Sequence, residues 1–179
     1  FICTRRAQHV SMLEILALAA FAGLLLYAAY TDITSLTIPN WISIALTAIF
    51  IVVAPFAGLT LTDMAVHLLF GLGVLGVGFL LFQANVFGGG DAKLLAAAAV
   101  WTGSIAIIPL LTWTAMAGGA LALAMLMARK VAAPVDGWPP FVNRLLTPQT
   151  GVPYGVAIMI GGLIATPALP IAARALTLL

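Results

Sequence analysis

Charged residues are scarce in this chain: Lys, Arg, Asp and Glu together make up 7% of its 179 residues. A soluble domain carries about 25% charged residues, so this chain has too few to cover a globule in water. Because 64% of the residues are hydrophobic and the mean hydropathy is +1.21, the surrounding solvent must be largely lipid. The apolar runs are long and unbroken, unlike the short alternating strands of a transmembrane barrel. The composition therefore predicts an all-α, polytopic membrane protein.

Cysteine and net charge are also low. The single cysteine, Cys3, excludes an internal disulfide framework and a zinc module built from cysteines. A net charge of +2, thinly spread, excludes the basic surface of a nucleic-acid-binding protein. We therefore expect no metal, no cofactor and no nucleic-acid partner.

Six transmembrane helices are predicted, all in one domain that covers residues 1–179. Their approximate bounds are 13–30, 41–57, 64–84, 91–100, 105–128 and 154–169. The apolar run 92–128 would form about 55 Å of helix, whereas one crossing needs about 30 Å, so this run must fold back. The favoured turn is Trp101-Thr102-Gly103-Ser104, because Gly ends helices and Ser begins them. A turn at Pro109 is the second choice.

The N-terminus allows two interpretations. Arg5 and Arg6 before an apolar run resemble the start of a signal peptide, but an uncleaved first span is favoured because more spans follow. Residues 1–11 are expected to be a flexible tail, or an extension upstream of a start at Met12.

The third predicted span is rich in glycine. Small residues let transmembrane helices pack backbone to backbone. We therefore expect close helix packing at Gly71, Gly73, Gly76 and Gly78.

Two aspartates stand at ends of predicted spans. Asp32 lies in a polar turn after the first span, and Asp91 follows three consecutive glycines before the fourth. Since two spans separate them, both should lie on one face of the membrane. Two neighbouring carboxyls share one proton, so that one can take a proton from water while the other polarises a peptide carbonyl. Spacing alone does not distinguish this pair from a polar flank at Asp32 and a helix cap at Asp91.

The cations give a weak indication of which face carries the aspartates. The aspartate face is predicted to hold Lys93, Arg129, Lys130 and Arg144, and the opposite face Arg5, Arg6 and Arg174. Four cations against three favour a cytoplasmic position for the aspartates, and a start at Met12 would make it four against one.

Asp63 and His67 form another titratable pair. They stand four residues apart on one helix face, as in some metal or proton sites, but on the side of the membrane opposite to the two aspartates. A helix-start acid beside an ordinary helix residue is the favoured interpretation, with Thr62 as the cap.

Three blocks of sequence resemble the type IV prepilin peptidases, which carry a G-x-G-D motif. The second block here is Gly88-Gly89-Gly90-Asp91-Ala92-Lys93-Leu94, and the first is Asp32 with Ile38-Pro39-Asn40 downstream. The third block is Pro153-Tyr154-Gly155-Val156-Ala157-Ile158. The chain has no insertion with paired cysteines like that of the larger, methylating members. It therefore resembles the short form found with tight-adherence pilus systems.

This resemblance implies an aspartic endopeptidase that uses Asp32 and Asp91 to cleave the leader of prepilin-like precursors. The reaction would take place at the cytoplasmic face of the bacterial inner membrane, with the precursor's N-terminal apolar helix in the bilayer. Residues that would bind substrate or shape the loops are Pro39, Asn40, Gly88, Gly90, Lys93 and Tyr154. For Lys93, a flanking residue that reaches the headgroups is the favoured alternative. The alternative function is a non-enzymatic assembly component or a proton-coupled transporter that uses intramembrane aspartates.

Overall fold

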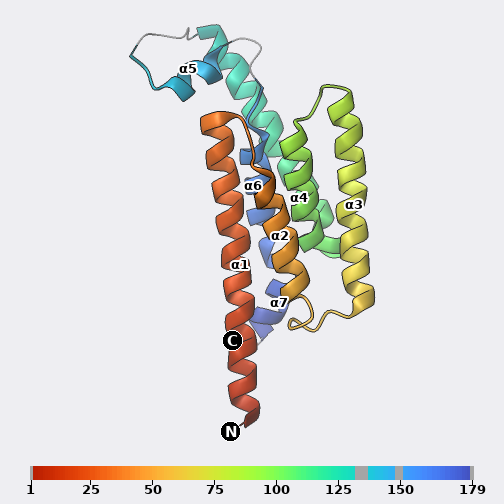
Figure 1. Ribbon diagram of the computed structural model, residues 1–179. Coiled ribbons are helices and arrows are strands. Elements are labelled where there is room, and N and C mark those ends of the chain that lie inside the picture. Colours follow the sequence, from red (N-terminus) through yellow and green to blue (C-terminus); the bar gives the residue numbers. More distant parts are fainter. Residues whose placement is uncertain (1, 132–136, 148–150, 178–179) are drawn as a thin grey trace.

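The computed structural model describes residues 2–131, 137–147 and 151–177, and among these the side chains of residues 12–131, 137–147 and 151–173. All regular structure in these ranges is helical, which confirms the predicted all-α class. The elements shown in Figure 1 are α1 (Ile2–Ser35), α2 (Asn40–Val53), α3 (Leu61–Gln83), α4 (Gly89–Val131), α5 (Pro140–Leu146), α6 (Tyr154–Ala165), the 3-10 helix η1 (Thr166–Ala168) and α7 (Pro170–Thr177).

Four helical segments in the described ranges are long and apolar enough to cross a membrane. They are Met12–Ser35, Leu61–Gln83, Gly89–Val131 and Tyr154–Ala173. α2 is apolar but has only 14 residues. Length and composition therefore support a helical membrane protein, and they assign four candidate spans where the sequence predicted six.

α1 extends beyond the predicted span 13–30 at both ends. At its start it reaches back to Ile2, through residues that were predicted to be a tail or an upstream extension. At its end, the prediction that Asp32 lies in a turn was wrong, because the helix continues to Ser35. The Thr31 hydroxyl donates to the carbonyl of Ala28, and the Ser35 hydroxyl donates to the carbonyl of Thr31. These polar side chains therefore find their hydrogen-bond partners within the helix.

α4 contains a reversal of the chain. Gly103 has φ 52° and ψ −146°, which is not helical. Figure 1 shows the first part of α4, in green, running down from its connection with α3, and the second part, in teal, running back up. The favoured turn at Trp101-Thr102-Gly103-Ser104 is thus confirmed, and Pro109 lies inside the helix that follows.

A buried ring cluster holds this reversal in place. His67 Nδ1 lies 2.7 Å from the carbonyl oxygen of Val100, one of the last carbonyls before the turn. The His67 ring stacks on Phe50 with ring centres 5.0 Å apart, and Trp101 Nε1 donates to the carbonyl of Leu46 over 2.9 Å. The described contacts of His67 are therefore those of a packed residue that ties α3 to α4.

Asp63 caps the start of α3. The amide of Thr60 donates to Asp63 Oδ2 over 2.9 Å, and the amide of Asp63 donates to Thr60 Oγ1 over 3.2 Å. The interpretation of Asp63 as a helix-start acid is confirmed, whereas the prediction of Thr62 as the cap was wrong. Thr60 takes that position because α3 begins at Leu61, which places Asp63 where a capping box needs its acid.

The glycines of α3 divide into two pairs. A Cβ on Gly71 would collide with Val100, and a Cβ on Gly78 would collide with Ala92, so these two glycines let α4 pack closely. A Cβ on Gly73 or Gly76 would meet no atom within 4 Å. The prediction of close packing is therefore confirmed for the first pair and wrong for the second, because α4 faces only one side of α3.

We expect Gly103→Ala to destabilise the fold. An alanine would have to adopt a backbone conformation that is open only to glycine, and its Cβ would lie 2.5 Å from His67 Cε1. Strain of this kind costs about 1–3 kcal/mol, which thermal unfolding in detergent measures as a lower midpoint. The control is Gly119→Ala, in the second part of α4, where a Cβ meets nothing within 4 Å. A midpoint lowered equally by both variants would contradict this account.

Candidate active site

Asp32 is fixed by the start of α6. It lies in the last turn of α1, is 5% exposed, and its Oδ2 accepts a hydrogen bond of 2.6 Å from the amide of Gly155. This amide belongs to the first turn of α6, where amides lack partners within the helix and favour an anion. A Cβ on Gly155 would lie 2.9 Å from Asp32 Oδ2 and 3.0 Å from Asp32 Cβ, so only glycine allows this approach.

Asp91 lies in the first turn of α4 and is 9% exposed. Its Oδ2 lies against Gly88, where an added Cβ would collide with it. Asp91 Oδ1 is buried and has no hydrogen-bond partner among the described residues. One oxygen of Asp91 thus lies against the loop, and the other has no hydrogen-bond partner within the described ranges.

Both aspartates line one cavity of about 340 Å³, here called the aspartate cavity. The other lining residues are Leu36, Phe82, Asn85, Val86, Phe87, Gly88, Gly151, Val152 and Tyr154. The structure therefore brings together the two acids that the sequence predicted to lie on one face. Within the described ranges, no group of three or more His, Cys, Asp or Glu side chains could hold a metal ion.

Of the other predicted site residues, only Gly88 and Tyr154 line this cavity. Gly90 instead packs against the loop before α2, where its Cβ would lie 3.2 Å from Ile38 Cβ. Pro39 is the residue that precedes the first turn of α2. Gly90 and Pro39 therefore lie where the start of α4 meets the loop between α1 and α2. Neither residue lines the aspartate cavity.

Lys93 and Asn40 form a second join between α4 and α2. Lys93 Nζ donates to Asn40 Oδ1 over 3.0 Å in an exposed position. Both residues line a separate apolar groove of about 680 Å³, which shares no lining residue with the aspartate cavity. The described contact of Lys93 therefore ties the start of α4 to the start of α2.

Cations gather at the same end of the molecule as the aspartates. Arg144, on α5, donates from Nη1 to the carbonyl of Thr34, two residues from Asp32, over 3.0 Å. Arg129, near the end of α4, donates from Nε to the carbonyl of Leu145 over 2.9 Å. The side chains of Arg5, Arg6 and Arg174 lie outside those that the structure describes.

Gly155, Asn85 and Phe87 were not among the predicted site residues. Asn85 has φ 55°, a left-handed conformation that Asn adopts more readily than most residues, and it directly follows Ala84, the C-cap of α3. The Phe87 ring lies edge-on to the Tyr154 ring, with ring centres 5.2 Å apart. A signal for Gly155 was present, since a glycine in the first turn of a helix lets another side chain reach the free amides.

The chain matches the model of the type IV leader peptidase family over residues 19–123. It belongs to this family. The match includes both Asp32 and Asp91 and ends before Tyr154. No curated protein and no solved structure gives a significant match. The chain is therefore a prepilin leader peptidase, a hydrolase of pilus biogenesis whose substrates are prepilin-like proteins in general.

On the prediction that Asp32 is catalytic, we expect Gly155→Ala to reduce cleavage by this leader peptidase by about 100-fold, because displacing a catalytic group by about 1 Å has an effect of that order. The added Cβ would push against the Asp32 carboxylate. The measurement is kcat/KM on a prepilin-like precursor, with thermal unfolding to verify that the variant folds.

The matched control is Gly23→Ala in α1, where a Cβ meets nothing within 4 Å. Unchanged kcat/KM in Gly155→Ala would show that the position of Asp32 does not depend on this close approach.

Proposed function

We propose that this leader peptidase is an aspartic endopeptidase in which Asp32 and Asp91 act together on one water molecule. The observation that carries the proposal is that two acids from distant parts of the chain, both buried, line one small cavity. Burying two carboxyls is costly unless they are used or paired. Membership of the family supports this function over the alternative of a non-enzymatic assembly component or a proton-coupled transporter.

The pair supplies both a base and an acid. With one proton shared between the carboxyls, the ionised one takes a proton from water, and the oxygen of that water forms a bond with the carbon of the scissile peptide. The protonated carboxyl donates a hydrogen bond to the carbonyl oxygen, where charge develops. The C–N bond then breaks, and the leaving amine takes a proton from the pair. Because the two groups titrate together, the roles belong to the pair and not to either residue.

The contacts of the two acids suit this division of work. The Gly155 amide donates a hydrogen bond to Asp32 Oδ2, and Asp91 Oδ2 packs against Gly88. Asp91 Oδ1, which has no partner among the described residues, is available to a water or a substrate carbonyl.

We also propose that the chain crosses the membrane six times. The crossings would be α1, α2, α3, the two parts of α4 on either side of Gly103, and α6 with its continuation through η1 and α7. Lys93, Arg129, Lys130 and Arg144 at the end of the aspartates outnumber Arg5, Arg6 and Arg174, which belong to the start of α1 and to α7 at the opposite end. This small excess favours a cytoplasmic position for the site in the bacterial inner membrane. The short form found with tight-adherence pilus systems stays a prediction.

The test replaces each aspartate separately by its neutral amide. We expect Asp32→Asn and Asp91→Asn each to lower the cleavage rate of a prepilin-like precursor by at least about 100-fold, because an amide cannot exchange the shared proton. The control is Asp63→Asn, the same change in an acid that caps α3 and does not line the cavity. Cleavage at the normal rate by either cavity variant would contradict the proposed function.

A further inference from the structure

A second cavity adjoins the aspartate cavity. It has a volume of about 850 Å³ and lies between α3, the second part of α4 and the first residue of α6. Three of its lining residues, Val86, Phe87 and Tyr154, also line the aspartate cavity. This cavity, here called the lateral groove, therefore meets the aspartates across these three side chains.

The lining of the lateral groove selects an apolar occupant. No charged residue lines it, and Thr114 and Tyr154 are its only side chains with polar groups. Along α3 it extends from Leu69 to Leu81, which is about 18 Å of helix at 1.5 Å per residue. This stretch lies within the candidate span Leu61–Gln83, so with α3 crossing a bilayer the groove would lie at the depth of the hydrocarbon.

Gly73 gives the groove room for a second helix. Packing within the chain explains Gly71 and Gly78, whose missing side chains let α4 approach, but a Cβ on Gly73 would meet nothing within 4 Å. A glycine that lines an open apolar groove lets the backbone of another helix approach closely. Gly76 is equally open but does not line the groove.

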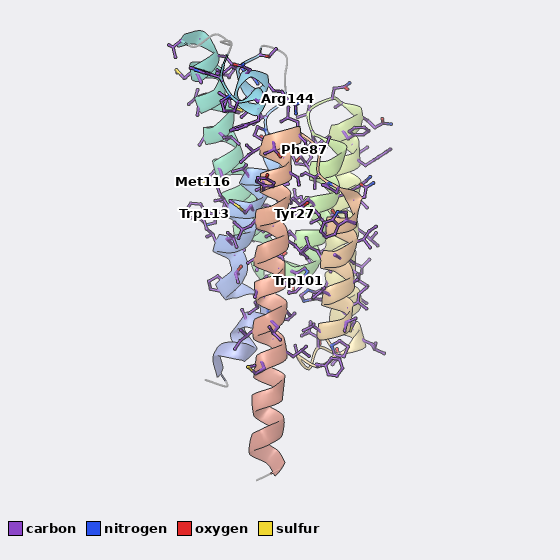
Figure 2. The ribbon with its side chains drawn as sticks, turned by 60° about the vertical axis from the view of Figure 1, so that its left-hand side comes forward. Tyr27, Phe87, Trp101, Trp113, Met116 and Arg144 are labelled. Carbon is purple, nitrogen blue, oxygen red and sulfur yellow. The ribbon has the colours of Figure 1, made fainter. Side chains whose placement is uncertain are left out.

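The junction between groove and aspartates is built from fixed side chains. The Phe87 ring lies against the Tyr154 ring, and a Cβ on Gly118 would lie 2.5 Å from Tyr154 Cε1, so α4 supports that ring closely. Figure 2 shows Phe87 near the end of the molecule that carries Arg144, with Trp101 farther down the bundle. A segment that leaves the groove at this end therefore arrives beside Asp32 and Asp91.

We propose that the lateral groove receives the apolar helix of the precursor, and that the precursor passes Phe87 and Tyr154 to enter the aspartate cavity. The inference rests on the proposed function, which requires a membrane-embedded substrate to reach the aspartates. Continuity with the aspartate cavity favours this groove over the apolar groove that ends at Lys93 and Asn40, because the latter shares no lining residue with that cavity. Lipid chains and a second copy of this protein are the other occupants that the experiment distinguishes.

The first experiment measures binding, so that it does not depend on the chemical step. In an Asp91→Asn background, we expect Gly73→Leu to weaken the binding of a precursor with an apolar N-terminal helix by at least 10-fold, because leucine fills the groove. Gly76→Leu is the matched control, since it adds the same side chain to the same helix, also in open space but outside the groove. Equal binding by the two variants would overturn the proposal. It would leave the aspartate proposal intact, because that proposal is tested by cleavage.

A second experiment covers the case in which Gly73→Leu does not fold. Cysteines are placed singly at positions 72, 73 and 76 in a Cys3→Ser background and cross-linked to a precursor with one cysteine in its apolar helix. We expect cross-linking from position 73 and not from 76, nor from 72, which lines the other apolar groove. Three results would overturn the proposal. The precursor could cross-link from position 72 alone, or position 73 could cross-link only to a second copy of the chain. Position 73 could also cross-link to no protein, as expected when lipid fills the groove.

Discussion

The 2.6 Å hydrogen bond between the Gly155 amide and Asp32 joins the last turn of α1 to the first turn of α6. In a chain with so few charged groups, a buried carboxylate needs a partner, and the free amides at a helix start provide one without a cation. This bond also needs a glycine, because a side chain at position 155 would collide with the acid. The aspartate cavity therefore depends on two helices that are distant in sequence and are joined by a hydrogen bond from a backbone amide to a side chain.

The reversal at Gly103 makes that meeting possible. It returns the second part of α4 to the end of the molecule where α4 began, so that α6 can start beside α1 and Asp91. Close helix contacts then set the spacing, at Gly71 and Gly78 between α3 and α4 and at Gly118 against Tyr154. The site is thus assembled at one end by helix packing, while α3 leaves an apolar groove open beside it.

Much of this organisation could be predicted from the sequence. The apolar runs gave the helical membrane class, the excessive length of the run 92–128 gave the reversal, and the number of spans between Asp32 and Asp91 placed both acids at one end. These features follow from local composition and from the thickness of a bilayer. The family match over residues 19–123 agrees with the motifs that contain the two acids.

Contacts between distant segments could not be predicted in this way. The polar residues around Asp32 suggested a turn, but their hydroxyls bond within α1, and the helix continues. The family resemblance implied that Gly90 and Lys93 bind substrate or shape the loops, yet Gly90 packs against Ile38, Lys93 donates to Asn40, and neither lines the aspartate cavity. Likewise the four glycines of α3 look alike in sequence, and only the position of α4 separates those that pack from those that remain open.

The most direct test of the account is whether the two acids meet in the membrane. Asp32→Cys and Asp91→Cys can be combined in a Cys3→Ser background, which leaves no other cysteine in the chain. A short bifunctional thiol reagent, applied to membranes, should then link positions 32 and 91 within one molecule, and each cysteine alone should react with an impermeant reagent from the same side. Labelling of the two positions from opposite sides of the membrane, without an intramolecular link, would contradict the account.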